Sequence, residues 1–463
     1  MGIARNARQF IAAPLDAVWA VLSDLDELPR WHPIFGSLAV VGGAAGPVAT
    51  GMRADWRPVI AASWVHRRFA PPIEVTACDP GRLLELTQPE PLGATVVRWE
   101  LHGDGAGTLV TQTVSSTGPS APLYDRILAR RLAARPNTTL ALLARRAGAA
   151  CEAPLNVVIA GGSGLLGRRI AADLTSRGHA VAILTRAVDP ALAFRQVEWD
   201  GRTVGAWADE LAKPRTAVIN LAGKLVDCRP TAANIAALTR SRVEPTRALV
   251  AAVARLGRPV PHWVQASTTA IWSDAGETPC TEGTPLPDPG LPQMTGVALP
   301  WEEAVAGAAA ERLTILRTSI VLESESPALG RLVSITRAGA GGRVGDGRQW
   351  FSWIHIDDWL AAVRRALGTD DGAGLPAGVV VAATENPVRN AELMRQLRRR
   401  LHRPPSPPTP APLLAVGAIA LRTDPALGLT GRYATSTMLR EVGFEFRFPT
   451  LDVALADLLP SRA

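Results

Sequence analysis

The sequence predicts two fold classes in tandem: an α+β unit with an antiparallel sheet, then an α/β unit with a doubly wound parallel sheet. Three observations support this prediction. Residues 1–150 show many short strand patterns closed by one long helical pattern. From residue 155 onward, strand and helix patterns alternate, as they do in parallel sheets. A glycine-rich turn joins the first strand of that second part to its first helix.

Length and charge narrow the organisation further. A chain of 463 residues is too long for one ordinary core and predicts two or three domains at roughly 150 residues each. We place them at 1–150, 155–385 and 386–463. The formal net charge of +7 comes from scattered arginines that do not alternate with aromatic side chains. We therefore expect no nucleic-acid partner, and read the arginines as solvated surface.

Cysteine and histidine usage argues against metal and disulfide sites. The four cysteines form no Cys-x-x-Cys pair, and the seven histidines show no metal-ligand spacing. We expect no metal and a reducing, cytoplasmic environment. The start of the chain lacks the pattern of a secretory signal. The longest apolar run near the C-terminus, 413–421, has about half the length of a membrane span, so none is expected.

The first unit begins with a short apolar run at 9–12 and an amphipathic helix. Pro14 opens this helix, because its fixed φ and missing N–H are tolerated there. Pro29 and Pro33 are predicted to end it. Strand patterns follow at 38–41, 53–60, 73–77, 83–87, 95–101 and 108–114. A single helix over 122–146 is predicted to cover the apolar face of the resulting sheet.

The opening of this unit resembles the START and polyketide-cyclase superfamily. The resemblance is carried by Ile11-Ala-Ala-Pro14 with Val18, Trp19, Leu22, Asp24, Pro29 and Trp31. It implies the helix-grip fold, with a pocket for an apolar small molecule between sheet and helix. Trp56, Trp64 and His66 are candidates to line that pocket. The alternative is a filled core that serves only folding or assembly.

The glycine-rich turn has the context of a dinucleotide site. The apolar run 155–160 reads as a strand buried on both faces, and a helical pattern runs from the turn to Arg177. In such a turn the first glycine allows the tight bend, the second lets the backbone approach a pyrophosphate, and the third lets helix and strand pack closely. The alternative is a turn without a ligand. The candidate cofactor-binding residues here are Gly161, Ser163, Gly164, Leu165, Leu166 and Gly167.

The end of the next strand, 180–184, bears on which dinucleotide binds. Arg186 follows it, where enzymes that use NAD usually carry a carboxylate for the ribose 2′-hydroxyl. An arginine suits a 2′-phosphate, so we predict NADP rather than NAD. Asp189 lies too far along to be that carboxylate. Asp200, after a third strand at 197–200, is a candidate to face the adenine.

Several further motifs resemble one atypical branch of the extended short-chain dehydrogenase/reductases, often labelled nucleoside-diphosphate-sugar epimerases. They are Asn220-Leu-Ala-Gly223, Ser241-Arg-Val-Glu244, Leu316-Arg-Thr318, Gly347-Arg-Gln-Trp350, Ser352-Trp-Ile-His355, Asn386-Pro-Val-Arg-Asn390 and Gly443-Phe-Glu-Phe-Arg-Phe-Pro449. The resemblance implies a Rossmann domain with a short C-terminal domain and a nicotinamide dinucleotide. It places Leu221, Ala222 and Gly223 beside that cofactor, and Ser267 where the class keeps its catalytic serine. Extended members often pair, so a homodimer is compatible with it.

The chain departs from this class at its chemistry. The class normally carries Tyr-x-x-x-Lys, whose tyrosine is the general acid/base. The two tyrosines here, Tyr124 and Tyr433, are not followed by lysine four residues later, and the segment 293–303 holds neither residue type. Phe351 occupies the position where sugar-nucleotide epimerases often place an arginine for the substrate pyrophosphate. The epimerase label therefore indicates ancestry more than substrate.

Other side chains could supply the acid. His355 has a suitable unperturbed pKa, but we expect it to fix the loop before the next helix. Asp274, Glu302 and Glu303 are further candidates, and the two glutamates are expected on solvated helix turns.

Three hypotheses follow. The first is an NADP-dependent oxidoreductase or epimerase acting on an apolar substrate, with Ser267 at the substrate oxygen. The second is a catalytically inactive NADP-binding sensor or scaffold, which the missing Tyr and Lys favour. The third is a lipid- or polyketide-binding module with a structural Rossmann half, which the intact glycine set weighs against.

Overall fold

The computed structural model describes residues 3–42, 46–59, 71–192, 194–370, 372–410 and 424–460. The apolar run 413–421 and the candidate pocket residues Trp64 and His66 lie outside these ranges.

The first unit is built on a seven-stranded antiparallel sheet in the order β1-β7-β6-β5-β4-β3-β2. Its strands alternate buried and exposed residues, because one face packs on the core and the other meets water. The strands are β1 (Ile3–Ile11), β2 (Phe35–Val40), β3 (Arg53–Pro58), β4 (Ile73–Asp79), β5 (Leu83–Glu90), β6 (Gly93–Asp104) and β7 (Gly107–Thr117).

Short helices at the start of the unit and one longer helix at its end pack on the buried face. They are α1 (Leu15–Ser23), α2 (Leu28–Trp31) and α6 (Pro136–Arg146). The sequence predicts that Pro29 ends the first helix, but α1 already ends at Ser23. Pro29 lies in the first turn of α2, where proline is tolerated.

The single helix predicted over 122–146 is broken in the structure. It consists of α4 (Ala121–Tyr124), the π-helical η1 (Asp125–Ala129), α5 (Arg130–Leu132) and then α6. Arg135, directly before Pro136, has a left-handed φ of 52°. The proline explains the break, because it disfavours the helical region for the residue before it. Arg135 therefore lies between the two helices, as the N-cap of α6.

The second unit holds a seven-stranded sheet in the order β10-β9-β8-β11-β12-β14-β18, and all of its strand pairs are parallel. Together with the antiparallel sheet of the first unit, this confirms the predicted fold classes. The strands are β8 (Asn156–Ala160), β9 (Ala180–Thr185), β10 (Arg195–Glu198), β11 (Thr216–Asn220), β12 (Val260–Thr268), β14 (Ala310–Thr318) and β18 (Gly378–Ala382).

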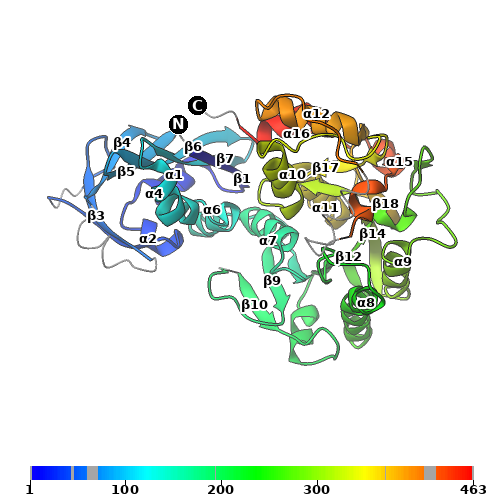
Figure 1. Cartoon of the computed structure of the whole chain (residues 1–463). Coiled ribbons are helices and arrows are strands. Elements are labelled where there is room, and N and C mark those ends of the chain that lie inside the picture. The colour runs from blue at the N-terminus through cyan, green and yellow to red at the C-terminus, as the bar shows by residue number, and fades with distance from the viewer. Residues whose placement is uncertain are drawn as a thin grey trace.

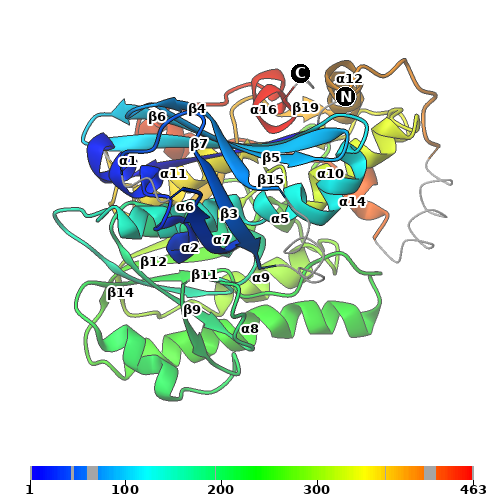
Figure 2. The ribbon, with the colours of Figure 1, turned by 90° about the vertical axis from the view of Figure 1, so that its left-hand side faces the viewer.

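Helices cover both faces of this sheet. Val157 and Ile159 point to the face of α7 (Leu165–Ser176) and α11 (Ile356–Leu367), whereas Val158 and Ala160 point to the other face. That other face carries α8 (Ala232–Ala254), α9 (Thr295–Glu303) and the short η2 (Ala206–Ala212). Figure 2 shows the long helix α8 along the outer side of this unit. The double covering explains the continuous apolar strands.

Short elements complete the second unit. They are η3 (Thr269–Trp272), β13 (Pro279–Cys280), β15 (Ile320–Leu322), α10 (Pro327–Arg337), β16 (Trp350–Phe351), β17 (Trp353–His355), β19 (Val388–Arg389), α12 (Asn390–Arg400), α14 (Ala426–Leu429), β20 (Tyr433–Ala434), α15 (Thr437–Glu441) and α16 (Leu451–Leu458). Residues of α10, α12 and α16 share one apolar cluster.

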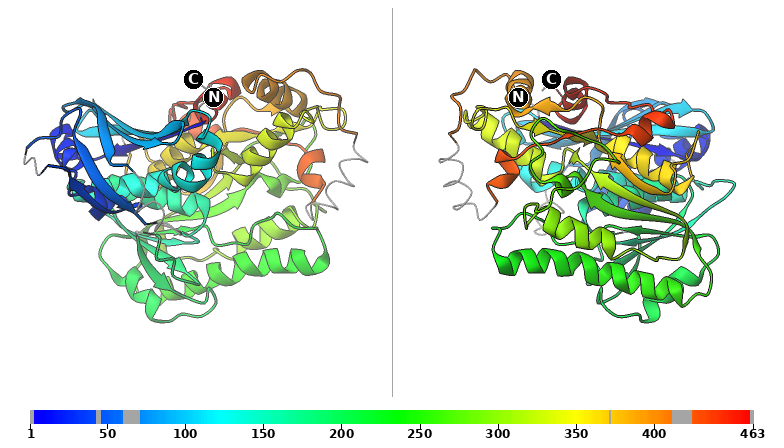
Figure 3. Two further views of the ribbon diagram at one scale, coloured as in Figure 1. Left: turned by 60° about the vertical axis from the view of Figure 1, so that its left-hand side comes forward. Right: turned by 90° about the vertical axis from the view of Figure 1, so that its right-hand side faces the viewer.

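The two units pack directly on one another. Helix α6 lies against α7 at the centre of the molecule (Figure 1). The amide of Ala12 donates to the carbonyl of Ser176 at 2.8 Å. The first strand and the last helix lie near one another (Figure 3). The Arg8 guanidinium on β1 lies 3.3 Å from the Asp457 carboxylate on α16. The first unit therefore packs on α7 and on the C-terminal helix of the second unit.

Candidate nucleotide site

The glycine turn lies at the switch point of the parallel sheet. Strand β8 is flanked by β9 on one side and β11 on the other, so the chain order reverses there, where open α/β sheets bind ligands. Gly161 has a φ of 79°, and a Cβ at this position would lie 2.8 Å from the backbone of Leu221. Only glycine permits this close approach of the turn to the end of β11.

The same turn sets the start of α7. A Cβ on Gly167 would lie 2.5 Å from the Cα of Gly162, so the helix rests directly on the turn. Gly164 is the N-cap, and the amides of Leu165 and Leu166 in the first turn have no acceptor within the helix. With the positive end of the helix dipole they form a cradle that fits a pyrophosphate.

The end of β9 presents a free cation. Arg186 is exposed, and within the described ranges its guanidinium makes no hydrogen bond or ion pair. The neighbouring Thr185 hydroxyl donates to the carbonyl of Ala187 at 2.8 Å and shapes the turn. Three residues after Arg186, Asp189 lies 2.9 Å from Arg135 of the first unit.

The end of β11 is held by a network around Asn220. Its amide nitrogen donates to Thr246 at 2.8 Å and to Gln265 at 3.0 Å, and its oxygen accepts from the amide of Ala222. A Cβ on Gly223 would press on the Arg242 side chain at 3.1 Å. These motif residues therefore fix the backbone of Leu221–Gly223 at the switch point.

The Asp200 side chain is hydrogen-bonded within a local turn. Its carboxylate accepts from the amides of Arg202 and Thr203 and from the Thr203 hydroxyl. These hydrogen bonds lower the pKa of Asp200 to about 2. A role beside the adenine stays a prediction.

Ser267 belongs to a buried polar cluster with Glu302 and Arg317. Its hydroxyl donates to Glu302 Oε1 at 2.5 Å, and Arg317 donates two hydrogen bonds to the same carboxylate, at 2.9 and 2.8 Å. The Arg317 guanidinium also lies over the Trp272 ring at 5.1 Å. All three cluster members are less than 10 % exposed. The cluster joins β12, α9 and β14 at the carboxyl end of the sheet.

The expectation that Glu302 lies on a solvated helix turn is wrong. Trp301 and Glu302 are both buried, whereas Glu303 is exposed as expected. Glu302 and Arg317 lie 15 residues apart on α9 and β14, and the folding of α9 against the sheet brings them together. A carboxylate directly after a tryptophan on an apolar helix face is the one local signal that could have revealed this burial.

His355 has a structural position. It is the N-cap of α11, where Nδ1 accepts from the amide of Asp357 at 3.1 Å. Its ring stacks on Phe448 at 3.7 Å, and Nε2 lies 3.4 Å from Asp457. The expectation that His355 fixes this loop is therefore confirmed. Tyr433 packs edge-on against Trp350.

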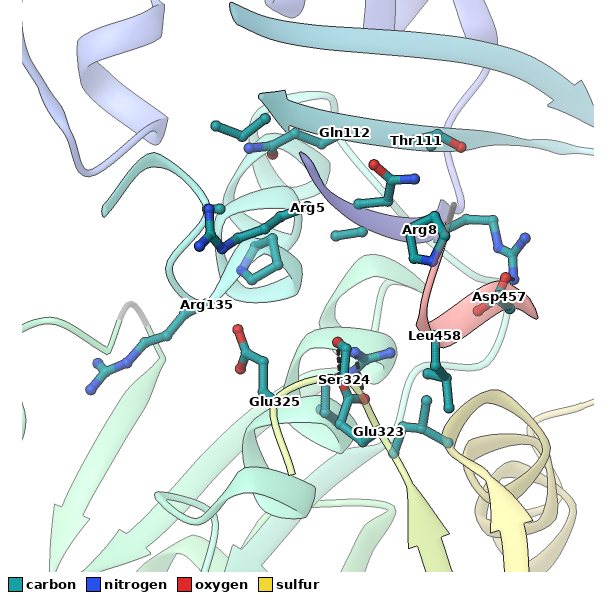
Figure 4. A pocket seen from close by; sticks show the side chains of 18 of the residues that line it. Arg5, Arg8, Thr111, Gln112, Arg135, Glu323, Ser324, Glu325, Asp457 and Leu458 are labelled. Carbon is teal, nitrogen blue, oxygen red and sulfur yellow. Dashed lines mark hydrogen bonds and ion pairs between the residues drawn. The ribbon is translucent and has the colours of Figure 1, made fainter. Parts of the chain in front are cut away.

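A pocket of about 620 Å³ opens between the two units rather than at the glycine turn (Figure 4). Its walls come from β1, β7, the kink at Arg135, the loop after β15, and α16. Charged side chains line it in pairs, such as Arg169 with Glu323 at 2.9 Å. It is distinct from the apolar pocket predicted inside the first unit. There, Trp56 is buried in the core and donates to Gln88.

Within the described ranges, no group of three or more His, Cys, Asp or Glu side chains is placed to hold a metal ion. Among the same residues, no helix is long and apolar enough to cross a membrane.

Three family models match the chain. Residues 157–382 match the NAD dependent epimerase/dehydratase family, residues 6–148 match a family of polyketide cyclases, dehydrases and lipid transport proteins, and residues 409–458 match a domain of unknown function. An epimerase family protein of Mycobacterium leprae is 31 % identical over 304 residues, which cover 65 % of this chain and 94 % of the relative. A bovine epimerase family protein is 29 % identical over 310 residues, 66 % of this chain and 100 % of the relative.

Two solved structures share the fold of this chain. The human epimerase family protein SDR39U1, crystallised with NADPH, is 25 % identical with a TM-score of 0.56 and covers 66 % of this chain and 99 % of its own. A nucleoside-diphosphate sugar epimerase from Corynebacterium glutamicum shares the fold over 98 % of this chain and 90 % of its own, at 23 % identity and a TM-score of 0.60. From these matches and the site geometry, we conclude that the chain belongs to the NAD dependent epimerase/dehydratase family and carries an N-terminal polyketide-cyclase-like unit.

Proposed function

We propose that the protein binds NADP at the switch point and catalyses oxidation–reduction, of the oxidoreductase or epimerase type, on an apolar carbonyl or hydroxyl substrate. The observation that carries the proposal is the intact glycine cradle beside an unpaired Arg186. The human relative crystallised with NADPH supports the choice of dinucleotide.

The two phosphate groups of the cofactor have residues that could hold them. The amides of Leu165 and Leu166 in the first turn of α7 would meet the pyrophosphate, because they have no acceptor within the helix. The amide of Gly164 donates to the carbonyl of Gly161 at 3.1 Å and shapes the turn. Arg186 offers two parallel N–H donors to a 2′-phosphate. Leu221, Ala222 and Gly223 line the adjoining strand end. Gly161 and Gly167 keep the turn and helix close enough for this cradle to form.

The chemistry would occur near Ser267. When bound, the nicotinamide ring supplies or accepts the hydride. Ser267 lies at the end of β12, next to β11. Its hydroxyl now donates to Glu302, so it can donate to a substrate oxygen only after the hydroxyl hydrogen turns away from that carboxylate. Without Tyr and Lys, the rate is expected to fall by about 10²–10⁴ relative to a complete site.

A second function is favoured by the state of the Ser267 cluster. The serine is 4 % exposed, its hydrogen is already donated, and Glu302 is neutralised by Arg317. A buried cluster whose polar groups already bind one another favours a structural role over a catalytic one. In that case the protein would be an NADP-binding sensor whose interaction surface depends on cofactor occupancy, without turnover.

Turnover distinguishes the two functions. The loss of NADPH absorbance would be followed with a panel of apolar aldehydes and ketones, for the wild type, Ser267→Ala and the exposed control Ser334→Ala. The enzyme proposal predicts slow turnover that Ser267→Ala abolishes and Ser334→Ala leaves unchanged. Tight NADPH binding without turnover of any compound in the panel would contradict the enzyme proposal and favour the NADP-binding sensor.

A further inference from the structure

The kink at Arg135 connects the N-terminal unit to the loop after β9. In Figure 4, Arg135 extends from the kink away from the pocket centre, with Glu325 close to the same segment. Burial raises the pKa of Glu325, and the nearby backbone amide of Arg135 opposes that rise. The Arg135 guanidinium lies 2.9 Å from Asp189. One residue of the first unit is thus held against two loops of the nucleotide unit.

Asp189 is the one carboxylate in the sequence 186–194, directly after the strand whose end recognises the ribose. Its pKa is held below the usual range by the hydrogen bond from the amide of Ala191, by the ion pair with Arg135, and by the charge of Arg168. It is therefore a fixed negative charge, and its main side-chain partner comes from the other unit.

Arg168 completes the group. It lies in the first turns of α7 and donates to the carbonyl of Ser163 in the glycine turn, at 2.7 Å. Burial lowers its pKa, and the positive charge of Arg135 lowers it further, so the two guanidinium groups are near one another. Two arginines from two units, Arg135 and Arg168, thus lie near each other, with Asp189 and Glu325 as the neighbouring carboxylates.

We propose that Arg135 of the N-terminal unit sets the preference for NADP over NAD by neutralising Asp189. The proposal rests on the proposed dinucleotide site. A 2′-phosphate dianion near an uncompensated carboxylate is repelled, whereas the uncharged ribose 2′-hydroxyl of NAD is not. Pairing Asp189 with Arg135 removes this repulsion. The fused unit thus acts as a selectivity element through a residue that need not touch the cofactor.

The test is a charge-rescue cycle on the full chain. Dissociation constants for NADPH and NADH would be measured for the wild type, Arg135→Ala, Asp189→Asn, the double variant and the exposed control Arg131→Ala. Arg135→Ala is expected to lower the NADPH-to-NADH preference about tenfold. Adding Asp189→Asn should restore it, because the charge to be neutralised is gone. Arg131→Ala should leave it unchanged.

The outcomes separate this inference from the proposed function. If wild type prefers NADPH and Arg135→Ala keeps the same preference, the inference is overturned while the dinucleotide site stands. Equal loss of both dinucleotides, without rescue by Asp189→Asn, would reduce Arg135 to a structural contact and also overturn it. If the wild type binds neither dinucleotide, the proposed function itself fails, and the inference fails with it.

Discussion

Two buried polar side chains, one in each unit of the molecule, are accommodated in opposite ways. In the N-terminal unit, His32 is fully buried, burial lowers its pKa to about 3, and Nε2 has no hydrogen-bond partner among the described residues. In the nucleotide unit, Glu302 is also buried but accepts three hydrogen bonds from Ser267 and Arg317. An uncharged ring tolerates a missing partner far better than a charged carboxylate does.

This difference indicates which region has unused binding capacity. Around His32, the indole N–H groups of Trp31 and Trp99 also have no acceptor in the described part of the chain, and their rings pack edge-on. Buried donors of this kind can meet the polar end of a ligand. They fit the predicted apolar ligand of the N-terminal unit, which stays a prediction. The Glu302 cluster, by contrast, is saturated.

The largest expected effect comes from breaking the saturated cluster. Glu302→Ala leaves the Arg317 charge buried without its carboxylate and is expected to lower the free energy of unfolding by about 3–5 kcal/mol. Denaturant unfolding followed by fluorescence measures the loss. Glu303→Ala, one residue along and exposed, should stay within about 0.5 kcal/mol of wild type. Equal effects of the two variants would contradict the cluster.

The next effect is a pH dependence in the N-terminal unit. His32 takes up its proton near pH 6.5 when unfolded but near 3 when folded, so stability falls as pH falls through that window. From pH 7 to 4 the loss is about 3 kcal/mol. Glu90, whose pKa burial raises to about 7, acts in the opposite sense.

The measurement is therefore a difference between two proteins. His32→Phe should remove the acid-dependent loss while Glu90 titrates in both. The unfolding free energy of each would be followed from pH 7 to 4. Parallel curves for wild type and His32→Phe would show that His32 is not held neutral by the fold.

A smaller effect sharpens the role of Ser267. Ser267→Ala removes one of the three hydrogen bonds to Glu302 and leaves both from Arg317. The expected loss of stability is about 1.5 kcal/mol, since the lost bond is to a charged group. Thermal unfolding checks it. A loss as large as that of Glu302→Ala would mean that the serine, rather than Arg317, holds the carboxylate in place.

Local features of the site were predictable from the sequence. Gly161, Gly164 and Gly167 lie within seven residues between a strand and a helix, and the backbone requirement is local. The two sheets were predictable because their burial also shows in local sequence. A strand buried on one face alternates apolar and polar residues, and a strand buried on both faces is apolar throughout.

Contacts between distant segments were not predictable. Glu302 and Arg317 belong to different elements, and Arg135 and Asp189 belong to different units, so no spacing in the chain relates them. Pro136 is a local signal for a helix break, but the helical pattern of the residues on both sides led to the prediction of one continuous helix. The sequence pattern placed Arg135 inside that helix and therefore gave no sign of its contact with Asp189.

The central claim is a dinucleotide site that prefers NADPH, and a binding titration tests it most directly. Tryptophan quenching by NADPH and NADH would be measured for the wild type and Arg186→Ala. We predict tighter binding of NADPH than of NADH, and loss of that preference in Arg186→Ala with NADH affinity unchanged. Binding of neither dinucleotide at physiological concentration would contradict the account and leave the parallel sheet as a scaffold.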